Sequence, residues 1–95
     1  SKAAVEALAR HLALELGDRG VNVNVVKAGL VETDSTRRLP GAAEILAQRR
    51  TKTMVGDRDL MPEDVANAVL YLASPLSDLV QGQTLVVDGG AAIHV

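Results

Sequence analysis

Two short strand-like segments, each preceded by a helical segment, constrain the fold of this 95-residue chain more than any other feature. "VNVNVV" at residues 21–26 and "QTLVVD" at 83–88 predict strands, because β-branched residues favour the extended backbone. A helix–strand–helix–strand order is typical of a parallel α/β sheet. The preference for right-handed crossovers makes the two strands parallel neighbours, joined through the second helix.

The first helix is predicted over residues 2–16, where Val5, Leu8, Leu12 and Leu16 recur at three- and four-residue spacing. The second helix is predicted over residues 62–74. It starts with a proline and two acidic residues, which suit the first turn of a helix. Each helix therefore has an apolar face that can pack on the sheet.

The segment between the first strand and the second helix, about residues 34–60, is irregular and contains one short helix, predicted at 42–50. Asn24 in the first strand is expected to be a buried, hydrogen-bonded amide that ties neighbouring loops together. Tyr71, the only tyrosine, lies in the apolar run of the second helix and is expected in the core rather than in a catalytic role.

Residues 1–95 are expected to form part of one larger α/β domain. Parallel sheets are covered on both faces, and one strand here has an outer edge with no partner in the sequence. The helical pattern also begins at Ser1 with no capping residue before it. The missing strands must then come from elsewhere.

Composition excludes several classes of function. A net charge of −2 argues against non-specific binding to nucleic acid, which needs a basic protein. The absence of cysteine rules out disulfides, thiolate catalysis and cysteine-ligated metal, and no metal site is predicted. No apolar run approaches the roughly 18 residues of a membrane span, and no signal peptide is visible. The sequence predicts a soluble, cytoplasmic protein.

Three stretches, in this order, resemble the C-terminal part of the short-chain dehydrogenase/reductase family: "SKAAVEALARHLALELGDRGVNVNVVKAGLVETD", "PEDVANAVLYLAS" and "GQTLVVDGG". The resemblance implies a doubly wound, Rossmann-type parallel sheet that binds NAD(H) or NADP(H). This chain would supply the last two strands. The glycine-rich phosphate loop would lie in an N-terminal half, because no such loop follows a strand here.

The resemblance also implies a catalytic role for Lys2, which matches the lysine of the family's tyrosine–lysine pair in its "SKAA" context. A phenol with a pKa of about 10 is a poor acid–base group at neutral pH, and a neighbouring ammonium favours its ionised form. By resemblance, the lysine also donates a hydrogen bond to the nicotinamide ribose. The partner tyrosine would precede Ser1.

The loop after the first strand, "KAGLVETD", is expected to hold the nicotinamide, because ligands of open α/β sheets lie beyond the carboxyl ends of the strands. By resemblance, Gly29 lets the backbone approach the ring, Val31 binds the carboxamide through its backbone, and the Thr33 hydroxyl binds the carboxamide or pyrophosphate. Asp34 or Thr33 would also cap the following helix, and the alternative for Thr33 is that it only caps. Ala28 replaces the family's usual proline.

Within the family, the sequence looks most like the enoyl-acyl-carrier-protein reductases of fatty-acid synthesis, which reduce an acyl thioester. A 3-oxoacyl-carrier-protein reductase or another alcohol or ketone dehydrogenase is the alternative. A third interpretation is a non-catalytic fragment that acts only in assembly, since residues 1–95 alone are expected to be inactive.

Residues 35–58 correspond to the family's substrate loop and carry six basic residues against Glu44 and Asp57. A basic rim could attract an acidic acyl carrier protein, although it could equally be a solvated loop. The resemblance also implies a homodimer or homotetramer, formed through the two long helices and the last strand.

Overall fold

The computed structural model describes residues 1–29, 31, 34–52, 54–55 and 58–94. It contains two strands, β1 (Val25–Ala28) and β2 (Thr84–Val87), that pair in parallel with Val25 opposite Thr84. The predicted parallel α/β arrangement is therefore confirmed. β1 is shorter and lies later in the chain than the predicted strand at 21–26.

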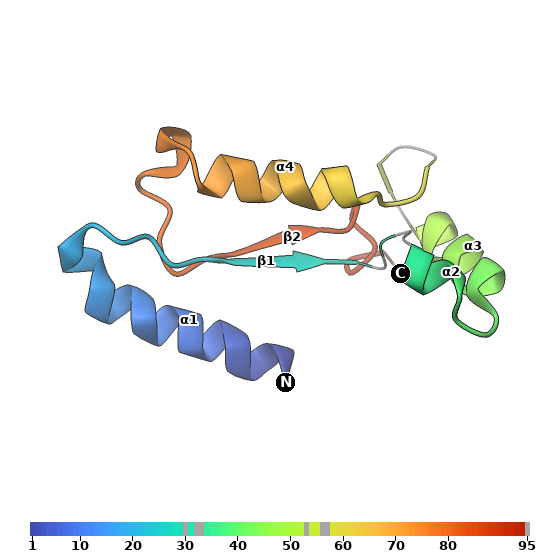
Figure 1. Ribbon diagram of the computed structural model, residues 1–95, viewed down its shortest axis with the longest axis horizontal. Helices are drawn as coiled ribbons and strands as arrows, with labels where there is room; N and C mark the ends of the chain where they lie inside the picture. The colour runs from blue at the N-terminus through green and yellow to red at the C-terminus, as the bar shows by residue number, and fades with distance from the viewer. Residues whose placement is uncertain (30, 32–33, 53, 56–57, 95) are drawn as a thin grey trace.

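Two long helices cover the sheet from opposite sides, as Figure 1 shows. Helix α1 (Lys2–Leu16) lies below the strands and helix α4 (Pro62–Leu72) lies above them. Two shorter helices, α2 (Asp34–Arg37) and α3 (Ala42–Lys52), pack on each other beyond the carboxyl ends of the strands. Helix α2 begins at Asp34, where the sequence analysis expected a helix capped by Asp34 or Thr33.

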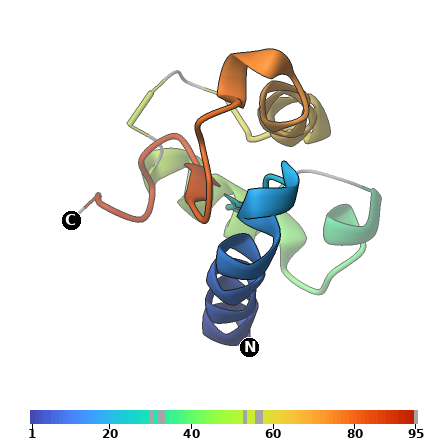
Figure 2. The same ribbon diagram turned by 90° about the vertical axis from the view of Figure 1, so that its left-hand side faces the viewer.

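The crossover from β1 through α4 to β2 is left-handed, so the handedness assumed from the sequence is wrong. In Figure 2 the strands point away from the viewer, with β1 to the right of β2 and α4 above them. With the strands pointing away and the connecting helix above them, a right-handed crossover would place β2 to the right of β1, whereas here β2 lies to its left. The rule for right-handed crossovers describes a twisted strand that feeds a helix packed back on the sheet, whereas here more than 30 residues, with α2 and α3 among them, separate Ala28 from Pro62.

Small residues form the contact between the helices and the sheet. The described buried apolar residues are all alanines: Ala9, Ala13, Ala42 and Ala68. Of the larger residues expected to pack inward from α1, Val5 and Leu8 are 56% and 57% exposed, whereas Leu12 and Leu16 are half-buried. Tyr71 is 40% exposed rather than in the core. A helix can approach a sheet most closely where its side chains are short, so the alanines take the contact line.

The segment before β1 is held mostly by side-chain amides, together with one backbone hydrogen bond from the Gly82 N–H to the Val23 carbonyl. The Asn22 amide donates to the carbonyls of Asp78 and Val80, both at 2.9 Å. The Asn24 amide donates to the Val80 carbonyl, and its side-chain oxygen accepts from the backbone N–H of Gln83, again at 2.9 Å. Asn24 therefore ties two loops together as predicted. These contacts explain why β1 starts only at Val25.

Both ends of α1 are capped by residues of this chain. The Ser1 hydroxyl accepts a hydrogen bond from the Ala4 N–H at 3.2 Å, so Ser1 is itself the cap that the sequence reading did not recognise. At the other end the chain continues into the 3-10 helix η1 (Gly17–Arg19) and turns at Gly20, whose φ is +76°. No helix in the described part of the chain is long and apolar enough to cross a membrane.

Candidate functional site

A groove runs between the first turns of α1 and strand β1, with a volume of about 320 Å³. Helix α1 runs antiparallel to β1, so its N-terminal turn lies beneath the carboxyl end of that strand (Figure 1). The wall from α1 consists of Lys2, Val5 and Glu6, and the wall from β1 consists of Val25, Val26, Lys27 and Ala28. The groove thus combines an apolar floor with three charged side chains.

The structure brings Lys2 to the strand end that the sequence analysis singled out. Lys2 shares the groove with Ala28, the residue directly before Gly29. Its side chain is exposed, and among the described residues it has no ion pair. An unpaired ammonium beside apolar walls can donate hydrogen bonds to hydroxyl groups of a ligand.

Gly29 follows β1 directly and extends the pairing with β2 by one residue. Its N–H donates to the Val87 carbonyl at 3.1 Å. A Cβ at this position would lie 3.2 Å from the Cβ of Asp88 and 3.7 Å from a methyl group of Leu60. A side chain at this position would therefore crowd Asp88, just beyond the end of β2, whatever ligand approaches it.

Beyond Gly29, the chain leaving β1 runs beside the chain entering α4. Val31 and Leu60 form an isolated parallel bridge. Thr33, the remaining predicted cofactor-binding residue, lies outside the described residues, so its role stays a prediction. Asp34 starts α2, as expected for a residue at a helix N-terminus.

The far end of the predicted substrate loop is fixed to the turn after β2. The backbone N–H groups of Met54 and Val55 both donate to the Gly89 carbonyl, at 2.7 and 3.2 Å. Gly90 has a φ of +89°, and a Cβ there would lie 3.0 Å from the Met54 sulfur. The loop therefore closes over the carboxyl ends of both strands.

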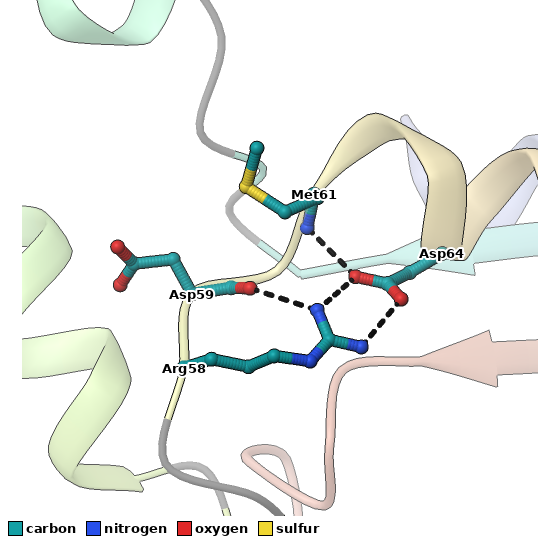
Figure 3. A network of polar contacts seen from close by, with 4 residues as sticks. All are labelled: Arg58, Asp59, Met61 and Asp64. Carbon is teal, nitrogen blue, oxygen red and sulfur yellow. Dashed lines mark hydrogen bonds and ion pairs between the residues drawn. The ribbon is translucent and has the colours of Figure 1, made fainter.

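An ion pair fixes the last residues of this loop to the start of α4 (Figure 3). The Arg58 guanidinium donates two hydrogen bonds to the Asp64 carboxylate, at 2.8 and 2.7 Å. The backbone N–H of Met61 donates to the same carboxylate at 2.8 Å. Arg58, which the sequence analysis counted with the basic rim, is thus neutralised by a carboxylate of α4.

These hydrogen bonds, first from Arg58 and then from the Met61 N–H, lower the pKa of the Asp64 carboxyl from 3.8 to about 2. A carboxyl whose pKa is lower when folded stabilises the fold above its unfolded pKa, and this contribution disappears as the pH falls through the folded pKa. The ion pair should therefore help to hold the loop at any pH above about 4 and weaken toward pH 2.

We expect Asp64→Asn to remove this pH-dependent contribution. Between about pH 4 and pH 2, the free energy of unfolding of the complete protein should fall less steeply in Asp64→Asn than in the unsubstituted protein. Urea denaturation at a series of pH values measures the difference. Asp78→Asn is the matched control, because that carboxyl is exposed and makes no ion pair among the described residues. Parallel slopes for Asp64→Asn and the unsubstituted protein would contradict the prediction.

The comparison with protein families agrees with this geometry. Residues 1–92 match the family model described as "Enoyl-(Acyl carrier protein) reductase", which belongs to the short-chain dehydrogenases/reductases. The chain belongs to the short-chain dehydrogenase/reductase family. The resemblance stated from the sequence is therefore confirmed at the level of the family.

The proteins of this family that are similar to the chain are named for different activities. The chain is 45% identical over 93 residues to "Dehydrogenase OXI1" of Cochliobolus heterostrophus, covering 95% of this chain and 40% of that protein. It is 41% identical over 91 residues to the 3-oxoacyl-[acyl-carrier-protein] reductase FabG of Rickettsia bellii, covering 95% of this chain and 36% of that protein. The chain thus spans well under half the length of the curated relatives it matches.

A solved structure of the family has the same fold. The chain superposes on a short-chain type dehydrogenase/reductase from Mycobacterium ulcerans with a TM-score of 0.87 at 35% identity, covering 98% of this chain and 34% of that one. The expected Rossmann-type class is confirmed. The left-handed crossover is thus part of a fold that the family shares.

Two features of the site were missed by the sequence reading. The first is the Arg58–Asp64 pair, whose signal is an arginine six residues before an acidic residue in the first turn of a helix. The second is Lys27, which the sequence shows as a single charge at the end of an apolar strand. In the structure Lys27 lies 3.6 Å from the Glu6 carboxylate.

Proposed function

We propose that this chain is the C-terminal part of an NAD(P)H-dependent oxidoreductase that reduces the double bond of an enoyl-acyl-carrier-protein thioester. The observation that carries the substrate is the match of residues 1–92 to the model described by that activity. The alanine at position 28, in place of the family's usual proline, favours the same branch.

The chain would work together with an N-terminal half that carries the glycine-rich phosphate loop. Three observations support this: the relatives are more than twice as long, the outer edge of β1 has no partner strand among the described residues, and the described core is four alanines. A preceding strand would pair with that edge, and its chain would cover the exposed residues of α1.

The groove fits the nicotinamide end of NAD(H) or NADP(H). Its valine and alanine walls suit an aromatic ring, and the ammonium of Lys2 suits ribose hydroxyl groups. Lys2, Gly29, Val31 and Thr33 would hold this end of the cofactor. When bound, the cofactor supplies a hydride. Lys2 would hold the ribose and favour the ionised form of a tyrosine supplied by the N-terminal half.

The substrate loop would present the acyl thioester at the same edge of the sheet. Arg37 and Arg38 are exposed on this loop and could attract an acidic acyl carrier protein. Arg58 would contribute little to this attraction, since Asp64 neutralises it.

A homodimer or homotetramer is also proposed. Large apolar side chains remain exposed on both long helices, including Leu14 at 82% and Leu70 at 68%. Together with Val86 of β2 they offer apolar surface on both sides of the sheet, which oligomer contacts could cover.

The test is reduction of two thioesters by the complete protein, followed through the loss of NADPH or NADH fluorescence. We expect crotonyl-CoA, a trans-2-enoyl thioester, to be reduced and acetoacetyl-CoA to be a poor substrate. The 95-residue chain alone is expected to be inactive, because it lacks the phosphate loop and the tyrosine.

The opposite preference would replace enoyl reduction by 3-oxoacyl reduction, which the FabG relative supports as the second candidate. If neither nucleotide is consumed with either thioester or with simple ketones, the oxidoreductase proposal fails. An assembly role would then remain.

A further inference from the structure

Three charged side chains line the groove, and only two of them pair. Lys2 and Glu6 come from successive turns of α1, and Lys27 comes from β1. The Lys27 ammonium lies 3.6 Å from the Glu6 carboxylate, with the two side chains 45% and 25% exposed. Lys2 has no ion pair among the residues that the structure describes.

This pairing is not the one that the helix itself would favour. Lys2 and Glu6 are four residues apart, a spacing at which oppositely charged side chains on a helix reach each other. Glu6 instead pairs across the groove with the strand. Without Lys27, α1 offers Glu6 two cations at this spacing, Lys2 one turn before it and Arg10 one turn after it.

We propose that Lys27 is a positioning residue that holds the Glu6 carboxylate away from Lys2 and so keeps the Lys2 ammonium available to a ligand in the groove. This inference rests on the proposed function in assigning Lys2 its role. It explains why a cation stands at the end of an otherwise apolar strand, where an alanine would also fill the space.

A simpler interpretation is that the Lys27–Glu6 pair only ties α1 to β1. The two interpretations differ in what happens when the carboxylate is removed. If the pair only attaches α1 to β1, then removing Lys27 or Glu6 breaks that attachment equally. If Lys27 keeps the Glu6 carboxylate away from Lys2, then removing that carboxylate leaves turnover unchanged. It also restores the turnover that is lost when Lys27 is replaced.

The experiment is a double-mutant cycle in the complete protein. Since exposed ion pairs are weak, we expect Lys27→Met to lower kcat about two- to fivefold. Glu6→Gln and the double variant Glu6→Gln/Lys27→Met should stay near the unsubstituted rate. Lys27→Arg should also retain activity. Equal losses in Lys27→Met, Glu6→Gln and the double variant, or no loss in Lys27→Met, would overturn the inference.

A second measurement does not depend on activity. The acetylation rate of Lys2 by an N-hydroxysuccinimide ester, followed by peptide mass spectrometry, should fall about two- to fivefold in Lys27→Met and recover in the double variant. Lys27→Gln serves if Lys27→Met does not fold. This pattern in a protein without oxidoreductase activity would reject the proposed function but keep the pairing. Equal labelling in all variants would reject the pairing.

Discussion

Replacing Lys2 with methionine is expected to lower the turnover of the complete enzyme by a factor of about 10² or more. Methionine keeps most of the length of the lysine side chain and removes only the charge and the donors. The structure places this side chain in the groove beside the end of β1, with no ion pair among the described residues, so its ammonium is able to act on a ligand there. Steady-state rates with saturating thioester and nucleotide measure the effect.

Tyr71→Phe is the matched control for this experiment. Tyr71 is the only tyrosine of the chain, but it lies on α4, on the opposite face of the sheet from α1 (Figure 1). Removing the Tyr71 hydroxyl should change turnover less than twofold, since a hydroxyl remote from the groove contacts neither the nucleotide nor the thioester. A heavy loss in Tyr71→Phe together with normal turnover in Lys2→Met would place the site on the other side of the sheet.

Gly90→Ala is expected to lower the free energy of unfolding by about 2–3 kcal/mol. The left-handed backbone, with φ of +89°, costs a residue with a Cβ about 1–2 kcal/mol. The new Cβ would also lie 3.0 Å from the sulfur and 3.2 Å from the Cβ of Met54. The Met54 sulfur can turn aside, but the Met54 Cβ is held near the turn because the Met54 N–H is bonded to the Gly89 carbonyl at 2.7 Å.

Gly20→Ala separates the two causes. Gly20 has a similar φ of +76°, but a Cβ there would meet nothing within 4 Å. Gly20→Ala should therefore lower the free energy of unfolding only by the about 1–2 kcal/mol that the left-handed backbone costs. Urea denaturation of the complete protein compares the two variants. Equal costs would mean that the substrate loop does not rest on the turn after β2.

The sequence predicted the order of the main elements because apolar periodicity and helix ends are local signals. The helix at 2–16 and the second strand agree with the structure within one residue. The inner face of α1 was predicted less well. Large apolar residues gave the visible stripe, yet the close contact is made by Ala9 and Ala13. Periodicity identifies apolar faces but not the distance between a helix and its sheet.

The candidate site was predicted only where a family motif marked it. Lys2 and the loop after β1 were found in this way. The Lys27–Glu6 pair joins residues 21 positions apart, and the Met54–Gly89 contact joins residues 35 positions apart. Such contacts depend on the path of the chain in space. The left-handed crossover sets that path, and no local sequence signal marks it.

The attachment of the substrate loop divides the protein into a constant part and a replaceable part. The loop is fastened where it leaves β1, at Gly89 and at Asp64, whereas α2 and α3 pack mainly on each other. New residues between these fastenings can thus arise without disturbing the strands or the groove. Substitutions in this small helical pair can therefore change the surface that the loop presents while the strands, the groove and the three points of attachment keep their geometry.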